Sequence, residues 1–273
     1  MKYAIISAGE GSRLAKEGIG IPKPLVKVGG ECLIDRLIRI FTAQGASEIV
    51  IICREAENEN DPMAMVHEHL QEMERNGLNG VEVPVRHIVK ATPSSMHSFY
   101  ELSKYLLGEP FVLTTVDTIF REDEFADYIA AFESSDCDGL MGVTDYIDDE
   151  KPLYVKTFPA PSIGGEASAG QSQSLSPLRG VGGVCQITGF LDADPEHSCT
   201  YISGGIYGLK PNAIDTLNRC MASGQSRMRN FQRGLVEDGR KLMAFPFSKV
   251  LDIDHASDIE KAERFIVRSG ERG

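Results

Sequence analysis

The sequence predicts an α/β protein with a three-layer, doubly wound, mostly parallel sheet. Two observations predict it. Short, almost wholly apolar runs of strand length alternate with stretches in which apolar residues recur at helical spacing. Strands that are apolar on both sides are typical of a sheet covered by helices on both faces, and helical crossovers make neighbouring strands parallel. The 273 residues are enough for one large α/β domain.

The first half of the chain supplies most of the expected sheet. Its candidate strands are Tyr3–Ser7, Glu48–Cys53, Val83–Val89, Phe111–Thr115 and Gly139–Val143. The helices expected between them are Leu33–Gln44, Pro62–Asn76, Ser95–Leu107 and Glu122–Ser134. In the first helix Leu33, Leu37 and Phe41 recur at helical spacing, which places one face on the sheet.

The residue composition and the apolar pattern change from about Lys151. Residues 159–180 are rich in Gly, Ser, Ala, Gln and Pro and lack apolar periodicity, so we expect a flexible insertion within a single domain of residues 1–273. A linker between two domains is the alternative. Further strands are expected at Gly183–Thr188, Tyr201–Leu209, Leu242–Phe245 and Val250–Asp252, the last two as a pair, and helices at Pro211–Ala222, Met228–Glu237 and Ala256–Val267.

Composition excludes several functional classes. The formal net charge of -12 argues against a general nucleic-acid binder, which needs a basic face for phosphates. No apolar run is long enough to span a bilayer, and the N-terminal residues lack a signal-peptide pattern, so no membrane partner is expected. Six scattered cysteines without metal-finger spacing suit free thiols in the cytoplasm. Nothing in the sequence indicates an oligomeric state.

A glycine-containing turn follows the first strand directly, in Ala8-Gly9-Glu10-Gly11. Glycines let backbone amides approach an anion, and in an open α/β sheet ligands gather at the carboxyl ends of strands. The turn is not a dinucleotide fingerprint, because Leu14 stands where the third glycine is needed, and no G-K-[ST] follows for a Walker A loop. A proline-flanked lysine, Lys23, comes shortly afterwards in Ile21-Pro22-Lys23-Pro24-Leu25. The prolines disfavour helix and predict a rigid extended segment that aims the lysine at a phosphate.

These two segments resemble the opening of the nucleotidyltransferases that include sugar-1-phosphate pyrophosphorylases and phosphocholine cytidylyltransferases. That family carries A-G-x-G-x-R-[LM] and then P-K-x-L, and residues 8–14 and 22–25 fit each defining position, with Ser7 in place of the usual preceding alanine. The resemblance implies the fold of nucleotide-diphospho-sugar transferases. It also implies that the loop at Ala8, Gly9 and Gly11 binds the triphosphate together with Arg13, and that Lys23 contacts the reacting phosphates.

Two carboxylates at strand ends are candidates for Mg²⁺, which takes one or two carboxylates together with waters and phosphates. Asp117 follows a buried strand, although it could equally cap the next helix, and the resemblance implies a metal-binding aspartate there. The segment Leu251-Asp252-Ile253-Asp254 resembles the closing pattern of the family, in which an acid ends a strand. We place Asp252 ahead of Asp254 as the second ligand, and expect Asp254 or Ser257 to cap the last helix.

Two further segments resemble the base and acceptor sites of the family. Ser94 and Ser95 follow the third strand at the position of the base-recognition loop, with Ser94 expected to cap the helix and Ser95 to bind the nucleotide. Gly205, in Ser203-Gly204-Gly205-Ile206-Tyr207, matches the glycine that lets a sugar approach the backbone; a bulged strand is the structural alternative. The E-K-P of sugar pyrophosphorylases is replaced by Gln186-Ile187-Thr188, which leaves the acceptor open.

The sequence therefore predicts an enzyme that transfers NMP from an NTP to a phosphorylated acceptor, a sugar 1-phosphate in the first place, with Mg²⁺ and release of pyrophosphate. The alternatives are a cytidylyltransferase or molybdopterin guanylyltransferase-like enzyme with a non-sugar acceptor, and a nucleotide-sugar-binding protein without turnover. The sequence does not indicate which NTP is used.

Overall fold

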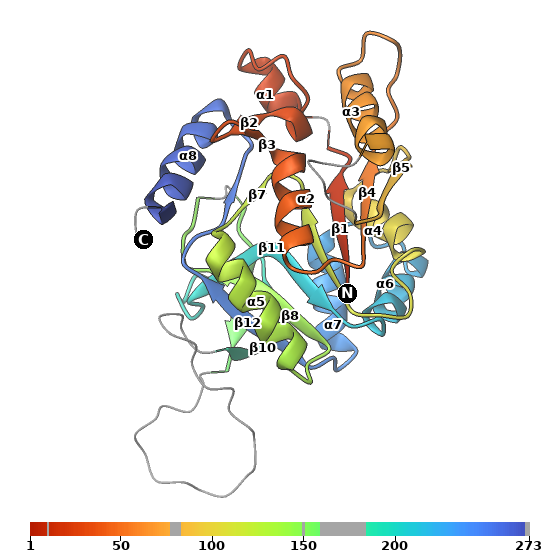
Figure 1. Ribbon diagram of the computed structural model, residues 1–273. Helices are drawn as coiled ribbons and strands as arrows, with labels where there is room; N and C mark the ends of the chain where they lie inside the picture. Colours follow the sequence, from red (N-terminus) through yellow and green to blue (C-terminus); the bar gives the residue numbers. More distant parts are fainter. Residues whose placement is uncertain (10, 77–82, 149–150, 159–183, 271–273) are drawn as a thin grey trace, which may run out of the picture.

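The computed structural model describes residues 1–273 except 10, 77–82, 149–150, 159–183 and 271–273, so the expected insertion at 159–180 lies outside the described residues. Within the described part, the centre of the protein is a nine-stranded sheet in the order β5-β4-β1-β6-β11-β8-β12-β10-β9 (Figure 1). Its strands are β1 (Lys2–Ser7), β4 (Glu48–Cys53), β5 (Val85–Val89), β6 (Phe111–Thr115), β8 (Gly139–Thr144), β9 (Tyr154–Thr157), β10 (Cys185–Leu191), β11 (Tyr201–Leu209) and β12 (Leu242–Phe247).

The sheet is mixed. Strands β5, β4, β1 and β6 are parallel to one another, as are β8 and β12, whereas β11 runs antiparallel to both β6 and β8, and β10 runs antiparallel to β12 and β9. The predicted α/β class is confirmed, but the sheet is not mostly parallel as expected, because β11, β10 and β9 make antiparallel pairs in its second half. Val250–Asp252 does not pair with β12 as expected: β13 (Leu251–Asp252) instead pairs antiparallel with β7 (Thr118–Ile119) in a separate ribbon.

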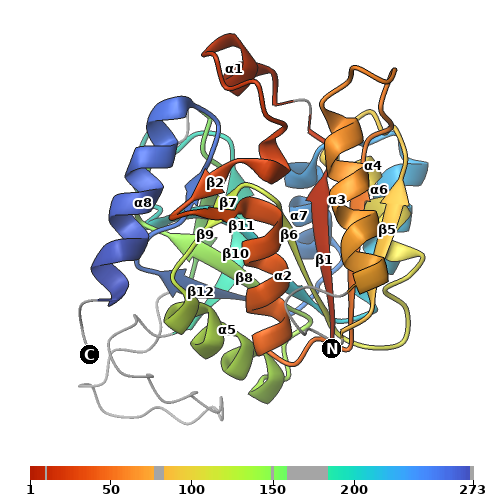
Figure 2. The same cartoon turned by 45° about the horizontal axis from the view of Figure 1, so that its top comes forward.

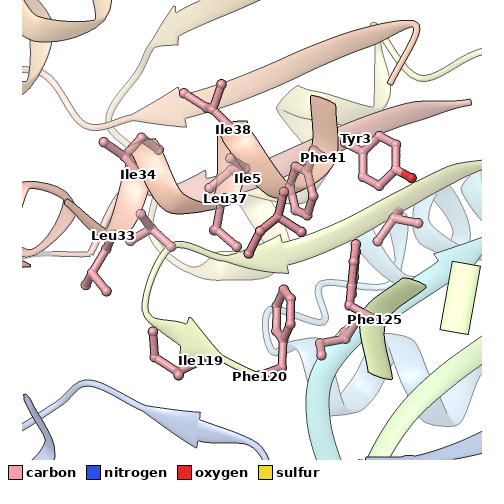
Figure 3. Close-up of a cluster of buried hydrophobic side chains, with 14 of the residues drawn as sticks. Tyr3, Ile5, Leu33, Ile34, Leu37, Ile38, Phe41, Ile119, Phe120 and Phe125 are labelled. Atoms are coloured by element: carbon pink, nitrogen blue, oxygen red, sulfur yellow. The ribbon is translucent and has the colours of Figure 1, made fainter. Parts of the chain in front are cut away.

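Helices pack against both sides of the sheet, because strand residues alternate between two buried clusters. Ile5 belongs to a cluster completed by α2 (Leu33–Ala43), α3 (Met63–Asn76), α5 (Glu122–Ser134) and α8 (Ala256–Gly270). Ile6 belongs to the other, which contains α4 (Ser95–Ser103), α6 (Ala213–Ala222) and α7 (Met228–Glu237). Figure 3 shows the first cluster, where Phe41 of α2 stacks on Tyr3 of β1 with ring centroids 4.6 Å apart.

Several short elements were not predicted. They are helix α1 (Ser12–Lys16), a 3₁₀ turn η1 (Lys23–Leu25), β7, β9, and the hairpin of β2 (Lys27–Val28) and β3 (Glu31–Cys32). The hairpin turns at Gly29 and Gly30, both with positive φ, which favours glycine at both positions. No helix in the described ranges is long and apolar enough to cross a membrane.

The strand order reverses beside β1. The chain passes from β1 to β4 and β5 on one side, and then crosses to β6 on the other side of β1. In open α/β sheets such a reversal leaves a crevice at the carboxyl ends of the two strands, and ligands bind there. In this chain that edge holds the residues after Ser7 and after Thr115, namely the glycine turn and Asp117. Figures 1 and 2 show α1 at this end, opposite the N-terminus.

Candidate functional site

The ribbon of β7 and β13 places the two acidic segments side by side. Asp252 is opposite Thr118 in the ribbon, and the amide of Ile253 donates a 3.1 Å hydrogen bond to the carbonyl oxygen of Asp117. The backbone of Asp117 is therefore fixed next to the stretch that carries both Asp252 and Asp254. Strand β13 ends at Asp252, so Asp254 lies beyond the strand, in the approach to α8.

Two cations and two carboxylates meet at this point. The Nζ atom of Lys23 lies 2.6 Å from Oδ2 of Asp117 and 2.7 Å from Oδ1 of Asp254. The guanidinium of Arg13 lies 2.8 Å from the other oxygen of Asp254. The cluster is graded in exposure: the Lys23 side chain is 11% exposed, whereas that of Arg13 is 53% exposed. It therefore has a buried inner part and a part that faces solvent.

The charges in this cluster reinforce one another. Burial alone would lower the pKa of Lys23, but Asp117 and Asp254 outweigh it and hold that pKa above its ordinary value. Burial would likewise raise the pKa of Asp254, but the hydrogen bond from Lys23 and the charge of Arg13 lower it. Lys23 is thus protonated and Asp254 ionised at neutral pH.

Lys23 reaches the cluster from a tight turn rather than from an extended segment. The amide of Val26 donates to the Lys23 carbonyl oxygen at 3.1 Å, and Pro24 is buried. The predicted extended conformation is wrong because Pro24 lies in the first turn of η1, where a missing N–H costs no internal hydrogen bond. Gly11 packs against this turn with φ +62, and a Cβ built there would lie 3.5 Å from that of Lys23.

The glycine turn presents an open backbone at the same edge of the sheet. Gly9 is exposed, and a Cβ added there would meet no atom within 4 Å. Ala8 is half-buried beside it. Gly11 precedes α1, which carries Arg13, so the turn, Arg13 and Lys23 are neighbours. Open backbone beside two cations suits an anion with several negative charges.

Asp252 lies at one side of this cluster. It is exposed, and its charge adds to burial in raising the pKa of the buried Tyr207 to about 12, against a hydrogen bond with Ser203. The structure thus brings Arg13, Lys23, Asp117 and Asp254 into direct contact. The second metal ligand stays a prediction: the sequence favours Asp252, whereas the structure shows that Asp254 contacts Lys23 and Arg13, which the spacing did not reveal.

The segment expected to bind a base begins α4. Ser94 caps this helix, as predicted, by accepting a 3.4 Å hydrogen bond from the amide of His97. The Ser94 hydroxyl also donates to the carbonyl oxygen of Ser226, at the approach to α7. Ser95 is the first residue of α4 and is half-buried.

Gly205 occupies a bulge in β11. The register of β11 against β8 shifts between Ser203 and Ile206, and Gly205 has φ +71. A Cβ at Gly205 would lie 3.8 Å from Oγ1 of Thr118, the residue after Asp117. The bulge anticipated as the structural alternative is present, and it places the backbone of Gly205 near the acidic segment.

The N-terminus of α8 is capped differently from the sequence expectation. Asp258 accepts hydrogen bonds from the amides of Asp254 and His255, and Glu17 accepts a 2.7 Å hydrogen bond from the amide of Ala256. Glu17 was not anticipated, because its partner Ala256 lies far along the chain and no local pattern indicates such a contact.

Comparison with known proteins gives a family for this arrangement. The family model "MobA-like NTP transferase domain" matches residues 3–177. The chain is 27% identical over 220 residues to the mannose-1-phosphate guanyltransferase of Schizosaccharomyces pombe. This aligned segment covers 80% of this chain and 52% of that protein. The chain thus spans about half the length of that curated relative.

Solved structures share the fold. A putative glucose-1-phosphate thymidylyltransferase from Bacillus anthracis superposes with a TM-score of 0.72 at 16% identity, covering 97% of this chain and 94% of that chain. The inositol-1-phosphate CTP transferase from T. maritima superposes with a TM-score of 0.67 at 16% identity, covering 97% of each chain.

Proposed function

The chain belongs to the MobA-like NTP transferase family, and from this premise we propose that it transfers NMP from an NTP to a phosphorylated acceptor and releases pyrophosphate. The proposed acceptor class is a sugar 1-phosphate. The observation that carries the proposal is the contact of Lys23 with both Asp117 and Asp254 at the carboxyl ends of β1 and β6. The two buried clusters on opposite sides of the sheet also support the three-layer, doubly wound arrangement.

The acidic pair fits a Mg²⁺ ion in its donor chemistry. Both residues offer carboxylate oxygens, and both already contact one cationic atom, so they converge on one place suited to positive charge. Two carboxylates are enough for Mg²⁺, because this ion generally keeps several waters and substrate phosphates as ligands. We propose Asp117 and Asp254 as the ligands, with Asp252 as the alternative to Asp254. A bound Mg²⁺ would supply neutralisation of phosphate charge.

Lys23 and Arg13 are proposed to act on the phosphates. In the structure the charges of Lys23 and Arg13 are balanced by Asp117 and Asp254. If these carboxylates held a metal, Lys23 and Arg13 would be left to pair with a triphosphate bound at the glycine turn of Gly9 and Gly11. There they stabilise charge on the transferred phosphoryl group and on the departing pyrophosphate.

The reaction asks for positioning more than for covalent chemistry. An oxygen of the acceptor phosphate attacks the α-phosphorus of the NTP in line. The bond from the α-phosphorus to the oxygen that bridges the α- and β-phosphates breaks, and pyrophosphate leaves. The attacking oxygen is already ionised, so no general base is needed. The proposed path for the acceptor runs along the half-buried backbone of Gly205, close to Thr118. Ser95, at the start of α4, is proposed to contact the base.

Two other functions remain to be separated by experiment. A non-sugar acceptor is suggested by the likeness to the inositol-1-phosphate CTP transferase fold. The other is nucleotide-sugar binding without turnover. Pyrophosphate release should be measured for each NTP with Mg²⁺ and a panel of hexose 1-phosphates, inositol 1-phosphate and phosphocholine. Release with one pairing identifies the enzyme and its acceptor, whereas tight nucleotide binding without release under any pairing would contradict turnover.

A further inference from the structure

Helix α1 carries Arg13 but has few anchors in the core. It has five residues, and only Leu14 among them is buried. Figures 1 and 2 show it standing at the edge of the molecule, away from the sheet. Isolated helices of this length are not stable in water, so the position of α1 depends on contacts with its neighbours.

Glu17 provides such a contact immediately after α1. One oxygen of its carboxylate lies 2.6 Å from Nδ1 of His255, and the other accepts a 2.7 Å hydrogen bond from the amide of Ala256. Ala256 is the first residue of α8, where the helix leaves its amides without internal partners and favours negative charge. Glu17 therefore fastens α1 to the N-terminus of a second helix far along the chain.

A second link joins the same two segments. Arg13 pairs with Asp254, which directly precedes His255. This link has to open if Arg13 turns toward a triphosphate and Asp254 toward a metal. The Glu17 link uses neither group and can stay closed during that exchange.

We propose that Glu17 is a positioning residue that holds α1 against the N-terminus of α8 while Arg13 exchanges Asp254 for the triphosphate. This inference rests on the proposed function. With Glu17 in place, Arg13 moves only its side chain. Without Glu17, α1 detaches together with Arg13, and the entropy cost of ordering α1 then weakens nucleotide binding.

The test compares Glu17→Ala with Lys16→Ala, the matched control, because Lys16 is exposed and directly precedes Glu17 at the end of α1. A third variant, Glu17→Gln, keeps an oxygen for the amide of Ala256 but loses the negative charge next to His255. The first measurement is amide hydrogen exchange of residues 12–17 and 256–259 without nucleotide. The second is calorimetric affinity for each of ATP, GTP, CTP and UTP with Mg²⁺.

In Glu17→Ala we expect faster exchange in both segments and about tenfold weaker binding of the preferred NTP, or about 1.4 kcal/mol, with a smaller change in Glu17→Gln. Lys16→Ala should match the wild type in both measurements. Unchanged exchange would overturn the link itself. Faster exchange with unchanged affinity would show that Glu17 only caps α8, and would overturn the positioning role.

The two proposals fail in distinguishable ways. If the wild type binds no NTP, the proposed function fails, and the role of Glu17 in nucleotide binding fails with it. The exchange measurement still decides whether Glu17 fastens α1 to α8, because it needs no nucleotide.

Discussion

The ammonium group of Lys23 contacts Asp117 at 2.6 Å and Asp254 at 2.7 Å, and so joins the end of β6 to the approach to α8. Both carboxylates lie at the edge of the sheet where the strand order reverses, beside the glycine turn. This contact explains how a strongly acidic chain can offer a cationic site to phosphates. The side chains of Lys23 and Arg13 are held in ion pairs with the carboxylates that a metal would take.

Replacement of Lys23 by Met removes the central cation. We expect kcat/KM for the NTP to fall by a factor of roughly 10² to 10³, because a preorganised charge at the reacting phosphates is lost. Stability should also fall by about 1–3 kcal/mol, because partly buried carboxylates lose a charged partner. Steady-state kinetics and urea unfolding check the two effects. Turnover within a factor of two of the wild type would remove Lys23 from the reacting centre.

A paired substitution decides between the two C-terminal aspartates. Asp254→Asn should lower turnover at least a hundredfold and weaken Mg²⁺ binding, because Asp254 shares Lys23 with Asp117. Asp252→Asn is the matched variant two residues away, and we expect a smaller loss, because Asp252 ends β13 next to Tyr207. Turnover and calorimetric Mg²⁺ affinity are measured for both. The reverse order of effects would assign the ligand to Asp252.

Gly205 should be intolerant of a side chain. With φ +71, Gly205→Ala forces an alanine into the left-handed region at about 1–2 kcal/mol. If the acceptor passes along the backbone of Gly205, the KM for the acceptor should rise about tenfold or more in this variant, with nucleotide affinity unchanged. Gly224→Ala is the control, because Gly224 has φ +75 and open space, and lies in the loop after α6. Equal kinetic effects of the two substitutions would make the acceptor role untenable.

Two histidines should give opposite pH dependences of stability. Burial, together with the charge of His67, lowers the pKa of His87 from 6.5 to about 4. Below about pH 6.5 the His87 side chain therefore binds a proton in the unfolded chain but stays neutral in the folded protein, so stability falls as the pH drops from about 6.5 toward 4. In His87→Leu the loss between pH 7 and pH 5 should be smaller than in the wild type by about 1–2 kcal/mol.

His69 supplies the contrasting case. Its hydrogen bond to Asp35, at 2.6 Å, raises its pKa, so its contribution is complete below about pH 6.5 and is lost as the pH rises through the folded value. His69→Gln should therefore be more destabilising at pH 5 than at pH 8. Urea unfolding at pH 5, 7 and 8 tests both histidines, and parallel pH profiles for the two variants would refute the assignment.

The sequence was most informative where local patterns were strong. Helices α5 and α7 and strands β4, β6 and β11 begin and end at the predicted residues, because each is a continuous apolar or amphipathic run with clear breaks. The short elements η1 and α1 were not predicted, because they are too short to show a periodic pattern and are fixed by the proximity of residues such as Gly11 and Lys23.

The site was predictable only in part, for a similar reason. Arg13, Lys23 and Asp117 stand in segments that resemble a family opening and a strand end, and the structure brings them together. The contacts of Asp254 could not be predicted from spacing, since they depend on where β13 ends and on the reach of Lys23. The contact of Glu17 with Ala256 is a long-range contact that no local pattern encodes.

The most direct test of the proposed activity is acceptor-dependent pyrophosphate release by the wild type and Asp117→Asn, measured side by side with Mg²⁺ and the NTP and acceptor panel. We expect the wild type to release pyrophosphate only when both substrates are present. Asp117→Asn should be at least a hundredfold slower while unfolding as cooperatively as the wild type. No acceptor-dependent release by the wild type, or a near-normal rate in Asp117→Asn, would contradict the proposed active site.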